Sequence, residues 1–145
     1  MQVVKKITTL ETYTVRQAVL RKGKPIETCH FIGDDLPTTT HFGIFEEEKI
    51  IGVVSVYKTN SPLFTAETQF QIRGMAVLEH FQNKGFGEQL LKVAENFCWQ
   101  EKANLIWFNA REKAVLFYKK LGYEVIGDAF DIPNIGIHFI MLKKN

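Results

Sequence analysis

The 145 residues of the chain, 46% of them hydrophobic, suffice for one domain with a real core and are too few for two, so we expect a single domain over residues 1–145. A net charge of +2, with acids and bases interspersed, provides no strong field for nucleic acid or a membrane surface. No apolar run approaches the ~20 residues that a membrane span needs, and no signal-like segment opens the sequence. We therefore expect a cytoplasmic protein.

Two cysteines do not make a disulfide framework. Cys98 falls on the apolar face of a predicted helix, where a thiol acts as a small core residue. Cys29 lies in a polar loop without the His or acid spacing of a nucleophile, and we interpret both thiols as inert. No metal site is predicted, because metal-ligand spacing is missing among His30, His41, His80 and His138.

In chain order, the first elements are a strand, a helix and a long loop. Gln2–Thr8 carries β-branched residues in rough alternation, and Tyr13–Leu20 has apolar residues at helical spacing. Residues 21–37 are polar and interrupted by Gly and Pro, which predicts a loop or short broken helix that can cover a ligand. Two β-rich runs around an acidic turn, Thr40–Phe45 and Ile50–Tyr57, predict a hairpin.

The second half alternates strands with helices. Strands are predicted at Gln69–Val77, Leu105–Phe108, Tyr123–Ile126 and Ile137–Leu142. One helix begins at Phe86, and a second runs from Ala114 to Leu121, where Gly122 ends it. This order predicts a mixed α/β sheet with a ligand site at the carboxyl end of a central strand.

The turn Gln82-Asn83-Lys84-Gly85-Phe86-Gly87, between that central strand and its helix, is suited to phosphate. Gly85 and Gly87 can take backbone angles closed to other residues and allow close approach, so successive N–H groups can point at one anion. The positive end of the helix dipole adds to this, which predicts pyrophosphate as the ligand. A Walker A loop would need Gly-Lys-Ser/Thr, and a dinucleotide fingerprint would need glycine in place of Leu90. A tight loop without a ligand is the alternative.

Gln-x-x-Gly-x-Gly at this turn resembles motif A of the GNAT acyltransferases, and Asn109-Ala110-Arg111 followed by Tyr118-Lys119-Lys120-Leu121-Gly122 resembles motif B. The resemblance implies the GNAT fold: a mostly antiparallel sheet of about seven strands, flanked by helices on both faces and splayed between the two central strands. It also implies acetyl-CoA as co-substrate. Its pantetheine arm would lie along the main chain near Met75 and Val77 and beside Asn109. Its pyrophosphate would be held by Gln82, Asn83, Lys84, Gly85, Phe86, Gly87 and Glu88.

Two of these residues depart from what the resemblance leads us to expect. Gln82 replaces an arginine and removes one phosphate charge, and Glu88 stands where a small or hydroxyl residue would suit phosphate better. The Glu88 side chain should therefore point away from the turn.

A closer resemblance covers nearly the whole chain and is to the glyphosate N-acetyltransferases, a branch of the GNATs. Its segments are Leu20-Arg21, Gln71-Ile72-Arg73-Gly74-Met75-Ala76, Asn109-Ala110-Arg111, Tyr118-Lys119-Lys120-Leu121-Gly122, Asp131-Ile132-Pro133, Ile135-Gly136 and His138. It implies direct acetyl transfer, in a ternary complex, to the amine of a small anionic acceptor, an amino acid or aminophosphonate.

In this resemblance Arg21, Arg73 and Arg111 bind the acceptor, as does His138, which also serves as the base. Tyr118 donates a hydrogen bond or proton to the departing sulfur. Plainer interpretations exist for each: surface charges for the arginines, a structural histidine, an aromatic packed on its helix, and a strand-end cap for Asn109.

The acceptor is the part that the sequence leaves most open. Residues 22–36 and 58–68 are expected to shape its site. Another amine, such as a polyamine, a sugar amine or a protein N-terminus, is an alternative, and so is a non-catalytic acyl-CoA-binding sensor. We expect a small-molecule amine as partner, no nucleic acid or membrane, and a monomer or homodimer.

Overall fold

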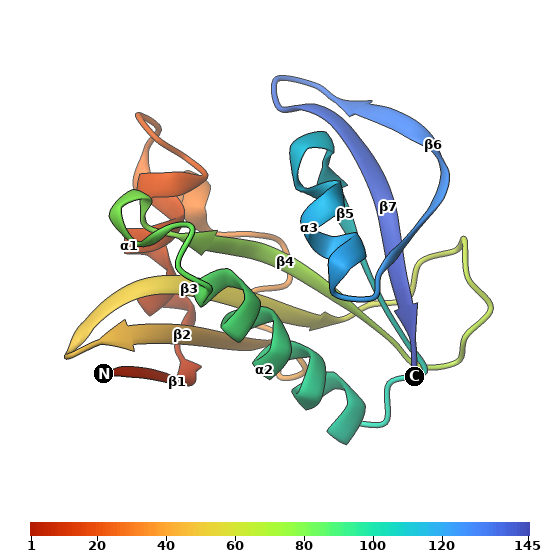
Figure 1. Cartoon of the computed structure of the whole chain (residues 1–145), viewed down its shortest axis with the longest axis horizontal. Coiled ribbons are helices and arrows are strands. Elements are labelled where there is room, and N and C mark those ends of the chain that lie inside the picture. The colour runs from red at the N-terminus through yellow and green to blue at the C-terminus, as the bar shows by residue number, and fades with distance from the viewer.

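The computed structural model describes all 145 residues as one seven-stranded sheet with helices on both faces (Figure 1). The strand order is β1-β2-β3-β4-β5-β7-β6, and every neighbouring pair is antiparallel except β4 with β5. The strands are β1 Gln2–Ile7, β2 Thr40–Glu46, β3 Lys49–Lys58, β4 Gln69–Val77, β5 Leu105–Arg111, β6 Glu124–Ile132 and β7 Gly136–Lys144. The helices are α1 Thr9–Val19, α2 Phe86–Gln100 and α3 Val115–Lys120, with short 3-10 turns at Ile26–Cys29, Glu79–Phe81 and Glu112–Ala114. The predicted α/β fold is confirmed, and no helix is both long and apolar enough to cross a membrane.

The sheet opens between its two central strands. β4 and β5 pair only where Gln69–Gln71 meets Leu105–Trp107. Beyond that point β4 stays with β3 and β5 stays with β7, so the two strands diverge (Figure 1). A bulge in β4 lies beside the opening: Ser55 is opposite Arg73, yet Val53 is already opposite Ala76. The predicted splay is therefore confirmed, and it leaves one edge of each strand without a partner strand.

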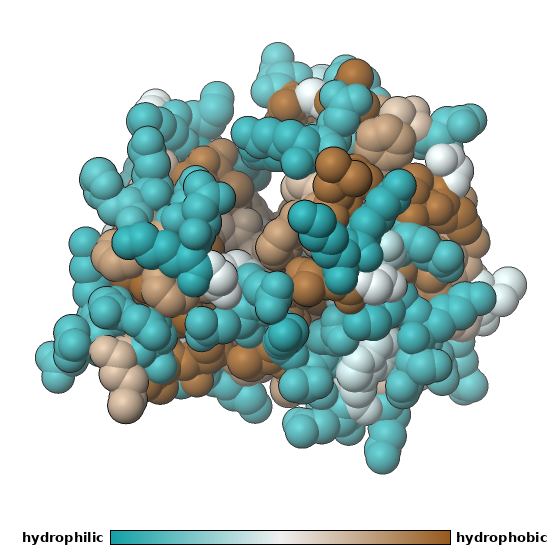
Figure 2. All heavy atoms as spheres, in the orientation of Figure 1, coloured by the Kyte–Doolittle hydropathy of each residue, from teal (hydrophilic) through white to brown (hydrophobic).

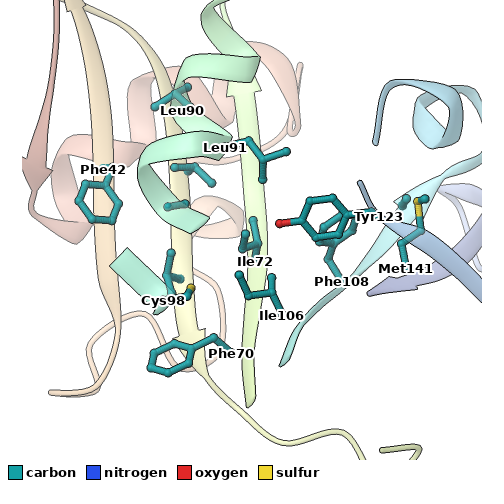
Figure 3. Packing of buried hydrophobic residues seen from close by; sticks show 14 of the residues in the cluster. Phe42, Phe70, Ile72, Leu90, Leu91, Cys98, Ile106, Phe108, Tyr123 and Met141 are labelled. Carbon is teal, nitrogen blue, oxygen red and sulfur yellow. The ribbon is translucent and has the colours of Figure 1, made fainter. Parts of the chain in front are cut away.

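The two faces of the sheet bury different helices because side chains alternate along each strand. On one face, Val15 of α1 packs against Val53 of β3. On the other, Leu90 and Leu91 of α2 pack over Ile72 and its neighbours in the main core (Figure 3). α3 lies on this same face, beyond the opening, so each half of the split sheet keeps its own helical cover.

Several elements are longer than their apolar patterns predict. α1 begins at Thr9 rather than Tyr13, because Thr8 and Glu11 form a capping box in which each side chain accepts a hydrogen bond from the other's backbone N–H. β6 continues past Ile126 to Ile132 through an irregularity at Gly127, whose φ is +72°. Most of β6 is exposed, so its outward side chains give little apolar signal.

Candidate active site

A cavity of about 620 Å³ lies where β4 and β5 separate. The end of α1, the loop after it, both diverging strands, α3 and the β6–β7 turn provide its walls. Figure 2 shows the molecule hollowed between its two halves, with apolar side chains inside the hollow. The cavity lining includes Arg21, Arg73, Arg111 and His138. Residues from four separate segments, each predicted to contact the acceptor, therefore lie in one cavity.

Positive charge in this cavity has no counter-charge. Arg21, Arg73, Arg111 and Lys113 line it, whereas no Asp or Glu does. None of these four side chains takes part in a salt bridge. Sequence reasoning missed Lys113, although its position two residues after Arg111, at the start of the turn into α3, was a usable signal. An anionic group is the ligand that this lining would attract.

The loop after α1 holds two of the arginines. Arg73 Nη1 donates a hydrogen bond to the Ile32 carbonyl oxygen at 3.1 Å, and its guanidinium lies 4.8 Å from the ring centre of Tyr57 and 5.5 Å from that of Phe31. The Arg21 guanidinium lies 4.9 Å from the same Phe31 ring. These are cation–π distances. Residues of the 21–37 loop thus form part of the cavity wall, as expected.

The other segment expected to shape the acceptor site lies elsewhere. None of residues 58–68 lines the cavity. Phe64 packs instead against a small cluster of Leu105, Trp107 and Leu142, and Trp107 Nε1 donates a hydrogen bond to the Thr59 carbonyl at 2.9 Å. That expectation was wrong, because this segment secures the paired beginnings of β4 and β5 and not their open ends.

His138 is buried, with 5% of its surface exposed, and it lines the cavity from β7. Its Nδ1 lies 2.8 Å from the Gly136 carbonyl oxygen. A carbonyl can only accept, so in the neutral ring Nδ1 carries the proton and Nε2 keeps a free lone pair. Nε2 has no hydrogen-bond partner in the protein and is not sealed from solvent. The side chain is therefore arranged to accept a proton.

Tyr118 enters the cavity from α3, with its ring centre 4.5 Å from that of Phe108. Burial raises the pKa of Tyr118 to about 12. Its hydroxyl hydrogen-bonds to no protein group, so a protonated donor is free to act on a ligand. Packing on Phe108 and presentation to the cavity occur together, so the two interpretations from sequence do not exclude each other.

The predicted phosphate turn has the backbone of an anion nest. Asn83 and Gly85 both have left-handed backbones, with φ of +62° and +87°. The N–H groups from 83 to 88 make no hydrogen bond within the protein, and they lie in the turn and first residues of α2. Gly87 corrects the sequence interpretation, because its φ is not positive and Asn83 supplies the second left-handed position.

Side chains anchor the turn away from this nest. Phe86 is 8% exposed and belongs to the main core. Glu88 pairs with Lys92 at 3.1 Å along α2, as expected of a side chain directed away from the turn. Of residues 82–88, only Gln82 lines the cavity, so the nest and the cavity are adjoining regions.

The remaining predicted cofactor-binding residues differ in whether their polar groups already have a hydrogen-bond partner and whether they line the cavity. Gln82 Nε2 donates a hydrogen bond to the Val77 carbonyl oxygen at 2.8 Å, so that oxygen already has a partner. Val77 also does not line the cavity. Met75 does line the cavity, next to the bulge. Asn109 lies within β5, and its exposed side chain hydrogen-bonds to no protein group, so it does not act as a cap.

A buried ionic network next to the cavity was missed from sequence. Arg16 and Asp34 have fully buried side chains and pair at 2.6 Å between Nη1 and Oδ2. Burial alone would raise the pKa of Asp34, but hydrogen bonds from Arg16, Tyr57 and the Phe31 N–H outweigh burial and lower it. Cys29 is fully buried beside this network, and burial raises the pKa of its thiol, which makes it inert. Asp34 lies 18 positions after Arg16, too far for any local spacing pattern to show the pair.

Comparison with known proteins agrees with this architecture. The sequence pattern of the acetyltransferase (GNAT) family matches residues 8–123. The uncharacterized N-acetyltransferase YitI of Bacillus subtilis is 35% identical over 140 residues, which cover 97% of this chain and 94% of that protein. Escherichia coli ElaA has a TM-score of 0.78 at 14% identity, over 99% of this chain and all of that one. An aminoglycoside 6'-N-acetyltransferase complexed with coenzyme A has a TM-score of 0.78 at 11% identity, over 98% and 96%. The chain therefore belongs to the GNAT family and is an N-acetyltransferase.

Proposed function

We propose that the protein transfers acetyl from acetyl-CoA to the amine of a small anionic acceptor, an amino acid or an aminophosphonate. One observation carries the choice of acceptor: Arg21, Arg73, Arg111 and Lys113 line one cavity that contains no carboxylate. A cationic amine would be repelled there, whereas a carboxylate or phosphonate could be held bidentately by the arginine guanidinium groups.

The described residues fit acetyl-CoA. The unpartnered N–H groups of 83–88 at the start of α2 suit its pyrophosphate, and the open edges of β4 and β5 offer main-chain groups to the pantetheine arm. A structural relative, the aminoglycoside acetyltransferase, is complexed with coenzyme A. The thioester supplies an acetyl group already activated for transfer to an amine.

The chemistry assigned to the chain needs two groups. As the acceptor nitrogen forms the amide bond and the C–S bond breaks, His138 Nε2 receives the proton of the amine. The Tyr118 hydroxyl donates a hydrogen bond to the departing sulfur. Both groups line the same cavity, so direct transfer requires both substrates to be bound together.

The position of Arg111 favours a small acceptor. It is directly opposite His138 in the pairing of β5 with β7, and such pairs have Cβ atoms roughly 5 Å apart. An acceptor whose acid and amine are separated by one or two carbons could therefore contact both side chains.

The test is thiol release from acetyl-CoA with amines that bear a carboxylate or phosphonate, beside cationic amines. Wild type, His138→Ala and Arg73→Ala would be compared. Lys5→Ala is the matched control, because Lys5 also lies over an aromatic ring, Phe45, but on β1 away from the cavity. We expect turnover with anionic amines only, a large loss of kcat/KM in both cavity variants, and none in the control.

Other results would contradict the proposal in distinct ways. Turnover of cationic amines with a neutral Arg73→Ala would leave an N-acetyltransferase but remove the anionic acceptor. Tight binding of acetyl-CoA without turnover of any amine would favour the sensor. Parallel lines in double-reciprocal plots of initial rate, with both substrate concentrations varied, would indicate a ping-pong mechanism in place of a ternary complex.

A further inference from the structure

We propose that Asp34, which does not line the cavity, is a positioning residue for the acceptor: its buried carboxylate fixes the groups that hold Arg73. The inference rests on the proposed anionic acceptor, since it concerns how one acceptor-binding arginine is held. It assigns Asp34 a role in acceptor affinity that is separate from the transfer step.

Three contacts define where the Arg73 guanidinium lies. Its Nη1 donates a hydrogen bond to the Ile32 carbonyl, and its Cζ lies over the rings of Phe31 and Tyr57. No acidic side chain pairs with it. Backbone and aromatic groups therefore hold the side chain in place while its charge stays available to a ligand.

Asp34 anchors all three of these contacts. Its Oδ2 accepts the Phe31 N–H at 2.7 Å, which fixes the backbone that carries both the Phe31 ring and the neighbouring Ile32 carbonyl. Its Oδ1 accepts the Tyr57 hydroxyl. One carboxylate thus ties the loop after α1 to β3 at the point where Arg73 rests on both.

Arg16 in turn fixes Asp34. Its guanidinium donates to both carboxylate oxygens, at 2.6 Å and 3.1 Å, and to the Cys29 carbonyl at 2.8 Å. Its Cζ lies 4.0 Å from the ring centre of Phe31, on which Arg21 and Arg73 also rest. Gly74, in the bulge of β4, packs closely against the same ring: a Cβ on Gly74 would lie 3.1 Å from the Phe31 ring.

An arrangement of this kind favours binding through preorganisation. A long arginine side chain loses rotamer freedom when it binds a ligand, and less is lost if the side chain is already held. A buried ion pair is often no more stabilising than well-packed apolar residues, so the Arg16–Asp34 pair is better explained by the geometry that it fixes.

The test is a double-mutant cycle in the full-length protein, with the anionic amine that is turned over fastest as acceptor. Asp34→Asn should raise its KM about 10-fold, with kcat and the KM for acetyl-CoA nearly unchanged. In an Arg73→Ala background the same substitution should have almost no further effect. A role in folding alone would not produce this dependence on Arg73.

Two further variants keep the test decisive. If Asp34→Asn does not fold, Tyr57→Phe removes one anchor and keeps the ring, and a smaller rise of about 3-fold is expected with the same dependence on Arg73. Tyr123→Phe is the matched control, because its hydroxyl also binds a carboxylate, that of the partly buried Glu95 at 2.9 Å, outside the cavity. Its acceptor KM should not change.

The positioning role alone would be overturned if the effects of Asp34→Asn and Arg73→Ala on the acceptor KM add. An equal rise of the acceptor KM in Tyr123→Phe would overturn it as well. If Arg73→Ala by itself leaves every acceptor unaffected, the proposed function fails instead, so the two failures can be told apart.

Discussion

Arg111 and His138 are directly opposite each other in the antiparallel pairing of β5 with β7, and both line the cavity between β4 and β5. This pairing places a fixed positive charge beside a ring nitrogen with a free lone pair. The register of two neighbouring strands thus sets the distance between the group that would hold an acid and the group that would receive a proton.

Replacing His138 by Gln should lower kcat by about 10²–10⁴-fold, because the amide side chain cannot accept the proton of the amine. The KM for acetyl-CoA should stay within about 2-fold, since the phosphate turn is at another part of the site. Steady-state kinetics with saturating acceptor would measure both. His80→Gln, an exposed histidine on the turn after β4, serves as the control and should behave as wild type. A kcat within about 3-fold of wild type would exclude His138 as the base.

Tyr118→Phe should lower kcat by roughly 10²-fold through loss of the hydrogen bond to the departing sulfur. Burial raises the pKa of Tyr118 to about 12, so its hydroxyl is protonated throughout the range in which the protein can be assayed. The ratio of wild-type to variant kcat should therefore be the same at about pH 7 and about pH 10. Tyr123→Phe, a neighbouring buried tyrosine whose hydroxyl binds Glu95, is the matched control. A ratio that falls toward one at alkaline pH would mean that the Tyr118 hydroxyl loses its proton within this range, against the pKa raised by burial.

Gly85→Ala should raise the KM for acetyl-CoA several-fold. Gly85 has φ of +87°, and no atom lies within 4 Å of the place where an alanine methyl would stand, so alanine would meet backbone strain of about 1–2 kcal/mol and no clash. Relief of that strain would turn the N–H groups away from one another. Gly127→Ala in β6 is an equivalent change, with φ of +72° and equally open space, far from the nest. Thermal unfolding should show similar losses for both, and only Gly85→Ala should affect acetyl-CoA; equal KM changes would contradict a phosphate role.

Features carried by local pattern were predictable from sequence. Gln69–Val77 was predicted with the bounds that the structure gives, because alternation is clear in a half-buried strand. The glycine turn followed from residue type and position, and α2 begins at Phe86 as expected. The gathering of Arg21, Arg73 and Arg111 in one cavity came from resemblance, since no single-sequence pattern reveals where distant charges meet.

Features that depend on long-range geometry were not predictable. The bulge at Gly74 depends on how β4 leaves β3, and the role of residues 58–68 depends on which end of the sheet they cover. The Arg16–Asp34 pair joins a helix to an irregular loop, where neither residue stands out from an ordinary surface charge. Burial is what distinguishes this pair, and burial is decided only when the loop folds onto the sheet.

The Arg16–Asp34 pair gives a stability prediction of its own. Asp34→Asn should lower the free energy of unfolding by about 3–5 kcal/mol at neutral pH, because Arg16 would remain buried without a counter-charge. The folded pKa of Asp34 is lowered below its ordinary value of 3.8, since hydrogen bonds outweigh the opposing effect of burial. A lowered pKa gives stability that is present above the unfolded pKa and lost as the pH falls through the folded one. The deficit of the variant should therefore be constant above about pH 5 and shrink below about pH 4.

Urea unfolding across this pH range would measure that deficit. Asp35→Asn is the matched control: the adjacent carboxylate is exposed and pairs with His30 at the surface, so its loss should leave stability nearly unchanged. An equal deficit at about pH 3 and pH 7 would mean that the Asp34 charge is not what stabilises the loop. In that case the loss would come from packing or from the neutral hydrogen bonds, which asparagine cannot all replace.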